Sequence, residues 1–296
     1  MKKIFTLLAL ITSFNVNAQV SENSTSPTGT YASAMGNGTT ASGNESTAMG
    51  YDTTASGEAS TAMGYSTTAT AQSSTAMGRS TTASGTNSTA MGNGSTASGT
   101  GSLAMGFGTT ASGNRSTATG AYTTASDFGS TVIGQYNSSG SSVTNNATSF
   151  STSNTAFVIG NGTNNSNKSD AFKVMFSGDT TVSNDLTVSG DVNISSDARL
   201  KSNIVSLGST LTKLLQIDGK SYEVKGKQKI GVLAQEIQEV FPELVSENDN
   251  EMLAVNYQGL VPVLINALKE QQSEINRLKE QEKRLERLEK LVANIN

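Results

Sequence analysis

The 296-residue chain contains no cysteine, no histidine and no tryptophan. Without histidine and cysteine the chain cannot build a Ser-His-Asp triad, a cysteine nucleophile or a metal site made from these side chains. Nucleophilic chemistry would have to use Ser or Thr, with Lys, Asp or Glu as the base. Disulfide bonds are also excluded, so stability must come from burial and from association of chains. The sequence predicts neither a metal nor a cofactor.

Basic clusters and long apolar segments are also missing. The net charge is −4 and no tract of Lys and Arg is present, which makes nucleic acid a poor candidate partner. Beyond the first residues, no stretch is apolar enough to cross a bilayer as a helix. We therefore expect no membrane-spanning segment in the mature chain.

The first 18 residues have the pattern of an export signal. Lys2 and Lys3 are followed by a mostly apolar run over residues 4–14 and by the small-residue site Val-Asn-Ala at 16–18. The alternative is a short membrane anchor, but the apolar run is shorter than the roughly 20 residues that span a bilayer. We expect removal of residues 1–18, a mature chain that begins near Gln19, and a secreted or cell-surface product.

Residues 31–136, which follow a short linker at 19–30, repeat with a period of fourteen. A glycine keeps one phase over eight periods, at Gly36, Gly50, Gly64, Gly78, Gly92, Gly106, Gly120 and Gly134. Alanine precedes it by two positions and Met usually lies between them. A disordered Ser/Gly/Thr linker is one interpretation, and a β-solenoid with one coil per period is the other. The constant phase favours the solenoid.

Fourteen residues allow two short strands and two tight turns per coil. Glycine at a fixed phase supplies backbone angles that other residues reach only with strain, and small Ala side chains suit a narrow interior. A core of Ala and Met is thin, so several chains packed side by side would share it. Met is a candidate for that shared face because it is flexible and apolar, the alternative being a Met core within one chain.

After Gln135 the period lapses, and it returns briefly at residues 157–162. Near-alternating apolar segments follow and predict short strands at 171–176, 180–182, 186–188 and 192–194. We interpret residues 137–195 as a β-strand stalk.

The character of the chain changes at Ser196, because 14 of the 20 Lys and Arg residues follow it. The pattern predicts helices at 207–217, 234–241 and 259–295, and strands at 220–224 and 229–233. The last helix is either a coiled-coil strand or a single amphipathic helix. Its apolar residues recur mostly at threes and fours: Leu264, Leu268, Ile275, Leu278, Leu285, Leu288, Val292 and Ile295.

The repeat resembles a known family. Ser-Thr-Ala-Met-Gly at residues 46–50 and again at 60–64 is similar to the YadA-type head of trimeric adhesins. This resemblance implies a left-handed parallel β-roll and a homotrimer. The charged C-terminal helix differs from the membrane anchor of such adhesins, so anchorage of that kind is not implied.

Residues 196–296 resemble the endosialidase-type intramolecular chaperone, a self-cleaving domain of phage tail spikes and tail fibres. Four stretches carry the similarity: Ser-Asp-Ala-Arg-Leu-Lys-Ser-Asn-Ile at 196–204, Ile-Gly-Val-Leu-Ala-Gln-Glu-Ile at 230–237, Val-Phe-Pro-Glu-Leu-Val at 240–245, and Val-Asn-Tyr at 255–257 with residues 260–269. The resemblance implies a small α+β domain that assembles three chains and then cuts itself off before Ser196.

The predicted reaction uses a Ser-Lys dyad. Ser196 would attack the carbonyl of Ser195 and break the Ser195–Ser196 bond, with Lys201 accepting the hydroxyl proton. Lysine accepts a proton only in its neutral form, which Arg199 would favour and Asp197 would oppose. We expect Ser196 to precede a helix whose first turn holds Lys201. The alternative is that Ser196 only caps a helix that begins at Asp197.

Gln235 and Glu236 follow a predicted strand and are candidates for supporting the cleavage site, the alternative being a helix start and a solvated carboxylate. Paired acidic residues of a glycan-cleaving enzyme are not found in the repeat. We therefore predict an exported homotrimeric fibre or adhesin-like protein with a single-turnover serine peptidase at its C-terminal end. The alternative is a surface adhesin that binds a host or matrix ligand and keeps an uncut trimerisation tail.

Overall fold

A computed structural model of the chain describes residues 24–138, 146–247 and 251–294. The chain divides into two units between Asp191 and Val192, and each unit is described by itself. The predicted export signal at 1–18 and the predicted apolar position Ile295 lie outside the described residues.

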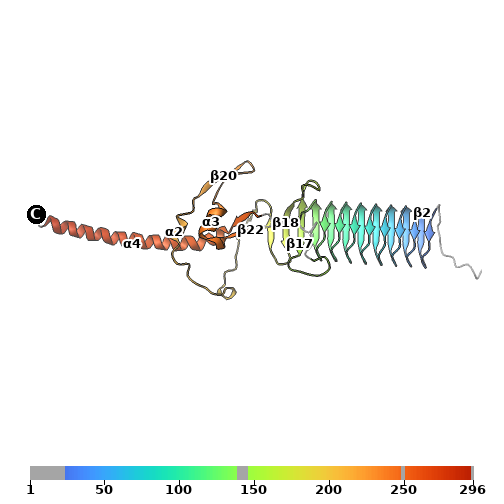
Figure 1. Cartoon of the computed structure of the whole chain (residues 1–296), viewed down its shortest axis with the longest axis horizontal. Coiled ribbons are helices and arrows are strands. Elements are labelled where there is room, and N and C mark those ends of the chain that lie inside the picture. The colour runs from blue at the N-terminus through green and yellow to red at the C-terminus, as the bar shows by residue number, and fades with distance from the viewer. Residues whose placement is uncertain (1–23, 139–145, 248–250, 295–296) are drawn as a thin grey trace, which may run out of the picture. The chain divides into compact units, whose positions relative to one another are not determined.

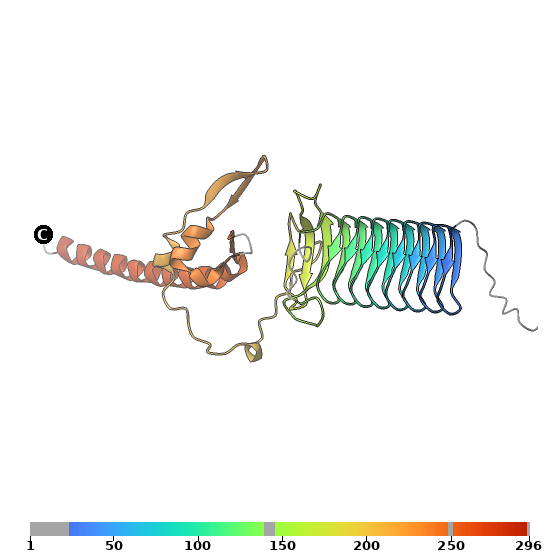
Figure 2. The ribbon, with the colours of Figure 1, turned by 45° about the vertical axis from the view of Figure 1, so that its right-hand side comes forward.

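The first unit is a stack of coils in which two strand sets alternate along the chain (Figures 1 and 2). One strand of each coil has two residues, and these strands form an eight-stranded sheet. They are β1 (Ser26–Pro27), β3 (Thr40–Ala41), β5 (Thr54–Ala55), β7 (Thr68–Ala69), β9 (Thr82–Ala83), β11 (Thr96–Ala97), β13 (Thr110–Ala111) and β15 (Thr124–Ala125).

The other strand of each coil has five residues and belongs to an eleven-stranded sheet. These strands are β2 (Ser33–Asn37), β4 (Thr47–Tyr51), β6 (Thr61–Tyr65), β8 (Thr75–Arg79), β10 (Thr89–Asn93), β12 (Leu103–Phe107), β14 (Thr117–Ala121) and β16 (Thr131–Gln135). The three further strands are β17 (Thr155–Asn161), β18 (Asp170–Met175) and β19 (Thr180–Val182).

Neighbouring coils pair in parallel with a shift of fourteen residues. In β4 and β6, for example, Ala48 lies opposite Ala62 and Met49 lies opposite Met63. Each residue therefore stacks on its counterpart one period later. The predicted β-solenoid with fourteen-residue coils is confirmed.

The interior of the stack consists of small side chains. Two rows of Ala, which include Ala48 and Ala55, are fully buried, and two rows of Ser and Thr, which include Ser46 and Thr53, are buried beside them. Strand alternation places Met49 outside this core, where it is half-buried. The Met residues are thus absent from the buried core of the described coils, and the interpretation of a Met core within one chain is wrong.

Two glycine series allow the coils to approach closely. Gly64 has a φ of +127°, which other residues adopt only with strain, and a Cβ there would overlap the carbonyl oxygen of Gly78 in the next coil. Gly57 belongs to the other series, and a Cβ there would overlap the carbonyl oxygen of Ala71. The backbone spacing of the stack depends on these missing side chains.

The sheet continues past the last complete period. β17 pairs in parallel with β16, and β18 and β19 follow as antiparallel strands. The predicted strands at 186–188 and 192–194 are wrong for the single chain, because these residues form no ladder. Their apolar side chains are exposed, Leu186 by 71%, and none of the strands in the described residues pairs with them.

The second unit combines short elements with one long helix. The 3₁₀ helices are η1 (Ala198–Leu200), η2 (Pro242–Leu244) and η3 (Tyr257–Gly259), and the α-helices are α2 (Leu211–Leu214), α3 (Ala234–Val240) and α4 (Leu260–Ala293). β20 (Lys220–Val224) pairs with β21 (Lys227–Gly231), and β22 (Val245–Glu247) pairs with β23 (Leu253–Val255), both antiparallel.

Two predicted boundaries in this unit need correction. The helix expected at 207–217 is only the single turn α2, because Gly208 with a φ of +66° lies before it and the turn closes at Leu215. The strand expected at 229–233 begins earlier, at Lys227, because residues 225 and 226 form a tight turn with positive φ.

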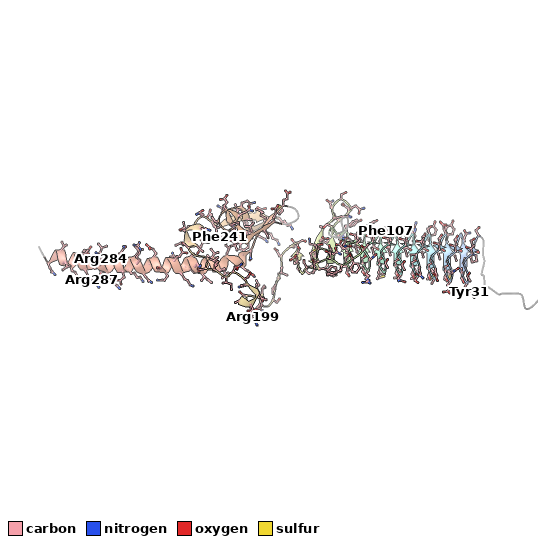
Figure 3. The ribbon with its side chains drawn as sticks, turned by 60° about the horizontal axis from the view of Figure 1, so that its bottom comes forward. Tyr31, Phe107, Arg199, Phe241, Arg284 and Arg287 are labelled. Atoms are coloured by element: carbon pink, nitrogen blue, oxygen red, sulfur yellow. The ribbon has the colours of Figure 1, made fainter. Side chains whose placement is uncertain are left out.

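The core of the second unit gathers around Ile237, Phe241 and Val263, which are buried together. The first turns of α4 contribute to this core through Leu260 and Val263, and Ala267 is also buried. The remainder of α4 is exposed along its length, and Figure 3 labels Arg284 and Arg287 on this part and Phe241 in the core. Among the helices of the described residues, none has both the length and the apolar character needed to cross a membrane.

Candidate functional site

The candidate site is a tight turn at the start of the second unit. Asp197 caps the 3₁₀ helix η1 by accepting a hydrogen bond from the Arg199 backbone N–H at 2.8 Å. The Lys201 N–H closes the turn by donating to the Ala198 carbonyl oxygen at 3.1 Å. The chain therefore folds back within six residues, and the Lys201 Nζ donates to the Ser196 Oγ at 2.8 Å.

The sequence left two interpretations of Ser196, as the nucleophile of a Ser-Lys dyad or as the cap of a helix, and this geometry bears on the second. The cap of the short helix is Asp197, so the interpretation of Ser196 as the cap is wrong. Ser196 precedes the helix, as expected. Lys201 follows the helix at its C-cap rather than lying in its first turn, because η1 has only three residues.

Asp197 and Arg199 form an ion pair beside the site. The Arg199 Nε and Nη2 donate to the Asp197 carboxylate at 3.0 and 2.6 Å. The hydrogen bonds from the Arg199 side chain and backbone lower the pKa of Asp197, and the same pair raises the pKa of Arg199. The two charges offset each other, so neither gives the site a strong field of one sign. Figure 3 labels Arg199 on this turn.

Ser196 and Lys201 are both exposed in the single chain. Lysine acts as a base only in its neutral form, and burial favours that form. The turn therefore brings nucleophile and base into contact, while the surroundings of one chain leave both in water.

Gln235 and Glu236 lie in the first turn of α3. The Lys220 Nζ lies 3.3 Å from the Glu236 carboxylate, which also accepts a hydrogen bond from the Asp218 N–H at 3.3 Å. Gln235 lines an open cavity of about 500 Å³ with residues that include Tyr222 and Met252. Within the described ranges no hydrogen bond joins Gln235 or Glu236 to Ser196 or Lys201. Their supporting role stays a prediction.

No cluster of three or more acidic side chains is arranged to hold a metal ion in the part of the chain that the structure describes. The contact that sequence reasoning missed involves Glu270 of α4, which accepts hydrogen bonds from Ser209 and Thr210. Ser-Thr before the apolar Leu211 is typical of a helix start. The acceptor, however, lies 60 residues further along the chain, and no local pattern connects the two.

Comparison with known families agrees with both resemblances. Residues 28–53 and 55–137, the latter in overlapping matches, match the YadA head domain repeat. Residues 196–246 match the chaperone of endosialidase. No curated protein matches the chain.

The two matches support a trimeric adhesin or fibre with a chaperone domain, located at the cell surface or outside the cell. The matched chaperone residues begin at Ser196, the first residue of the candidate turn. The chain therefore carries segments that match two known families, the YadA head repeat and, further along, the chaperone of endosialidase.

Proposed function

We propose that this chain is an exported homotrimeric fibre or adhesin-like protein whose C-terminal unit assembles three chains and then cleaves the Ser195–Ser196 bond. The observation that carries the proposal is the 2.8 Å contact between the Lys201 Nζ and the Ser196 Oγ. This contact lies where the chaperone match begins, which is where a chaperone would have to separate from its fibre.

Three outward-facing apolar surfaces support self-association. The Met row of the first unit, including Met63 and Met77, faces outward on the eleven-stranded sheet. The strand-like residues 186–194 expose Leu186, Val192 and other apolar side chains. Extended apolar surfaces of this kind mark sites of protein association.

Helix α4 provides the third surface. Leu278 is 51% exposed and Leu285 is 58% exposed, and both belong to the apolar stripe that the sequence predicts. A stripe at threes and fours becomes buried when helices wrap around one another. Three copies of α4 in a coiled coil would hold three chains together at their C-terminal ends.

The proposed reaction begins with a transfer of the Ser195 acyl group. The Ser196 Oγ forms a bond to the Ser195 carbonyl carbon, and its proton moves to the neutral amine of Lys201. The C–N bond then breaks, and Lys201 returns the proton to the Ser196 nitrogen. Water hydrolyses the resulting ester, which frees the Ser195 carboxylate and restores the Ser196 hydroxyl.

Assembly would activate this reaction. Ser196 and Lys201 are exposed in one chain, so the burial that favours a neutral lysine would have to come from the other chains. Cleavage would then follow trimer formation. Assembly before cleavage favours correct pairing of the strands. Pairing between distant strands is slow and leaves unpaired strand edges exposed to aggregation. Three α4 helices held in a coiled coil would raise the local concentration of the strands.

The test uses the purified full chain and its mass. Wild type should yield two fragments that part between Ser195 and Ser196, and Ser196→Ala and Lys201→Ala should remain intact. Ser202→Ala and Lys227→Ala are matched controls of the same residue types at exposed positions and should cut like wild type. Alanine variants of Ser196 or Lys201 that still split at this bond would refute the dyad.

The exposure of the dyad in one chain also favours a second candidate, in which the tail trimerises but does not cut. The protein would then be a surface adhesin whose coil stack binds a host or matrix ligand. This candidate predicts an intact chain of full mass in the trimer, and binding by residues 31–136. The mass measurement distinguishes the two.

A further inference from the structure

The residues that follow the candidate site do not pack against the core of the second unit before Thr210. Residues 202–209 are all exposed, whereas Thr210 is only 2% exposed. Within residues 202–208 the one hydrogen bond seen is local, from the Gly208 N–H to the Ser206 Oγ at 3.4 Å. Thr210 is therefore the first buried point after Lys201.

A single carboxylate of α4 holds this point. The Glu270 Oε1 accepts a hydrogen bond from the Thr210 N–H at 2.5 Å, and its Oε2 accepts one from the Ser209 Oγ at 2.7 Å. The Leu211 N–H lies 3.4 Å from both oxygens. We call this contact between Glu270 and residues 209–211 the latch. The hydrogen bonds from Ser209 and then from the Thr210 backbone lower the pKa of Glu270.

Thr210 strengthens the same connection from the other side. Its Oγ1 donates to the Val263 carbonyl oxygen of α4 at 3.0 Å. Once the latch and the Thr210–Val263 hydrogen bond that it supports are both lost, the next residue of this segment that packs against the core cluster is Leu214. The latch thus fixes how much free chain separates the Ser196–Lys201 turn from α4.

The length of this free chain sets the reach of the turn. Eight residues at 202–209 span at most about 28 Å, and neighbouring packed helices lie about 8–10 Å apart. The turn therefore reaches the surface of an adjacent chain while it stays tied to its own α4. Lengthening the free chain to Leu214 lowers the effective concentration of the turn at any fixed docking surface by about twofold, because this concentration falls roughly as the −3/2 power of length.

We propose that Glu270 is a positioning residue for self-cleavage, which holds the chain carrying Ser196 and Lys201 on helix α4 and keeps the turn within reach of its docking surface. This inference rests on the proposed function. Glu270 does not touch the reacting atoms and acts through Ser209 and Thr210.

The test compares the full-length Glu270→Ala variant with Glu274→Ala, an acidic residue one turn further along α4 whose partner is Arg277. We expect Glu270→Ala to slow cleavage by about twofold or more and to speed amide hydrogen exchange at Thr210 and Leu211. Glu274→Ala should match wild type in both. Light scattering should show that both variants still form trimers.

A double-mutant comparison of Ser209 and Glu270 tests whether the two residues affect cleavage through their shared hydrogen bond or through separate losses of stability. Ser209→Ala should slow cleavage in the wild-type background and change nothing in the Glu270→Ala background, because the latch is already broken. If Glu270→Ala assembles poorly, Glu270→Gln takes its place, since it keeps the size of the side chain but turns an amide N–H group toward the donors.

The outcomes are distinct. A wild-type chain that remains uncut refutes the proposed function and this inference with it. A wild-type chain that cuts, together with a trimeric Glu270 variant that cuts at the same rate, overturns the inference alone.

Discussion

Three glycine-to-alanine variants test whether missing side chains set the coil spacing. Gly64→Ala combines a positive φ with overlap against the Gly78 carbonyl oxygen. Gly57→Ala introduces overlap with the Ala71 carbonyl oxygen only, because the φ of Gly57 is not positive. Gly178→Ala introduces strain only, because its φ is +95° and nothing lies within 4 Å of the added carbon. The set separates strain from overlap.

Ala71 provides an estimate of how much stability Gly57→Ala should cost. Ala71 occupies the same phase as Gly57 one coil later, so the stack already accommodates one Cβ at this position. In the glycine coils, both Ser56 and Gly57 donate to the Ala69 carbonyl oxygen, whereas in the next coil only the Thr70 N–H is seen to donate to Ala83. The Cβ is therefore accommodated with the loss of one backbone hydrogen bond, which costs about 1 kcal/mol.

At the phase of Gly64, every coil from Gly36 to Gly134 has glycine, so no coil shows how a Cβ would be accommodated there. Backbone strain at a positive φ costs about 1–3 kcal/mol. The overlapping atom belongs to the backbone of the next coil, so the coils must separate and lose roughly one or two hydrogen bonds of about 1 kcal/mol each. We expect a loss of about 2–5 kcal/mol for Gly64→Ala and about 1–2 kcal/mol for Gly57→Ala. Gly178→Ala should cost about 1–3 kcal/mol from strain alone.

The assay is denaturant unfolding of the full chain, followed by the β-sheet circular dichroism signal. The unfolding midpoint should fall most for Gly64→Ala, and the midpoints of the two other variants should lie between those of Gly64→Ala and wild type. Equal midpoints for Gly64→Ala and Gly178→Ala would refute the reasoning, because overlap between coils would then have no energetic cost.

Two further predictions concern association and pH. Met77→Asp places a charge in the outward Met row, so the β-sheet circular dichroism signal should melt at a lower temperature than in wild type, whereas Ser84→Asp, at the exposed residue that follows β9, should match wild type. Because its hydrogen bonds lower the pKa of Glu270, the latch is complete above the ordinary carboxyl pKa of 4.5 and is lost as the pH falls through the lowered value. The helical circular dichroism signal should therefore melt at a higher temperature in wild type than in Glu270→Gln at pH 6, and the difference should shrink as the pH is lowered below 4.5.

Strict periodicity made the coil stack predictable. Gly50, Gly64 and Gly78 keep one phase, and a phase kept over many periods favours a β-solenoid with one coil per period. The pairing of each residue with its counterpart one period later confirms this fold. The contact of Ser196 with Lys201 was also expected, because it joins residues five positions apart within one turn.

Interactions that depend on distant partners were not predictable in this way. The alternating apolar residues around Leu186 and Val192 have the pattern of strands, but a strand needs a partner, and within the described part of the single chain no strand pairs with them. Glu270 has no feature that distinguishes it from the other acidic residues of α4, and its contact with Thr210 exists only because the core brings α2 onto α4. Gly208 limited α2 to one turn although the apolar pattern extends over eleven residues.

The register of the stack makes its length adjustable. Because every coil offers the next one the same backbone edge, deleting or duplicating one whole period leaves each remaining pair of strands matched as before. Such a change would alter the length of the stack by about 4.8 Å per coil. A deletion that is not a whole number of periods would break this match, and a deletion of a single residue would set glycine against methionine. Duplication of whole periods within the sequence would therefore give stacks of different length that keep the same strand pairing.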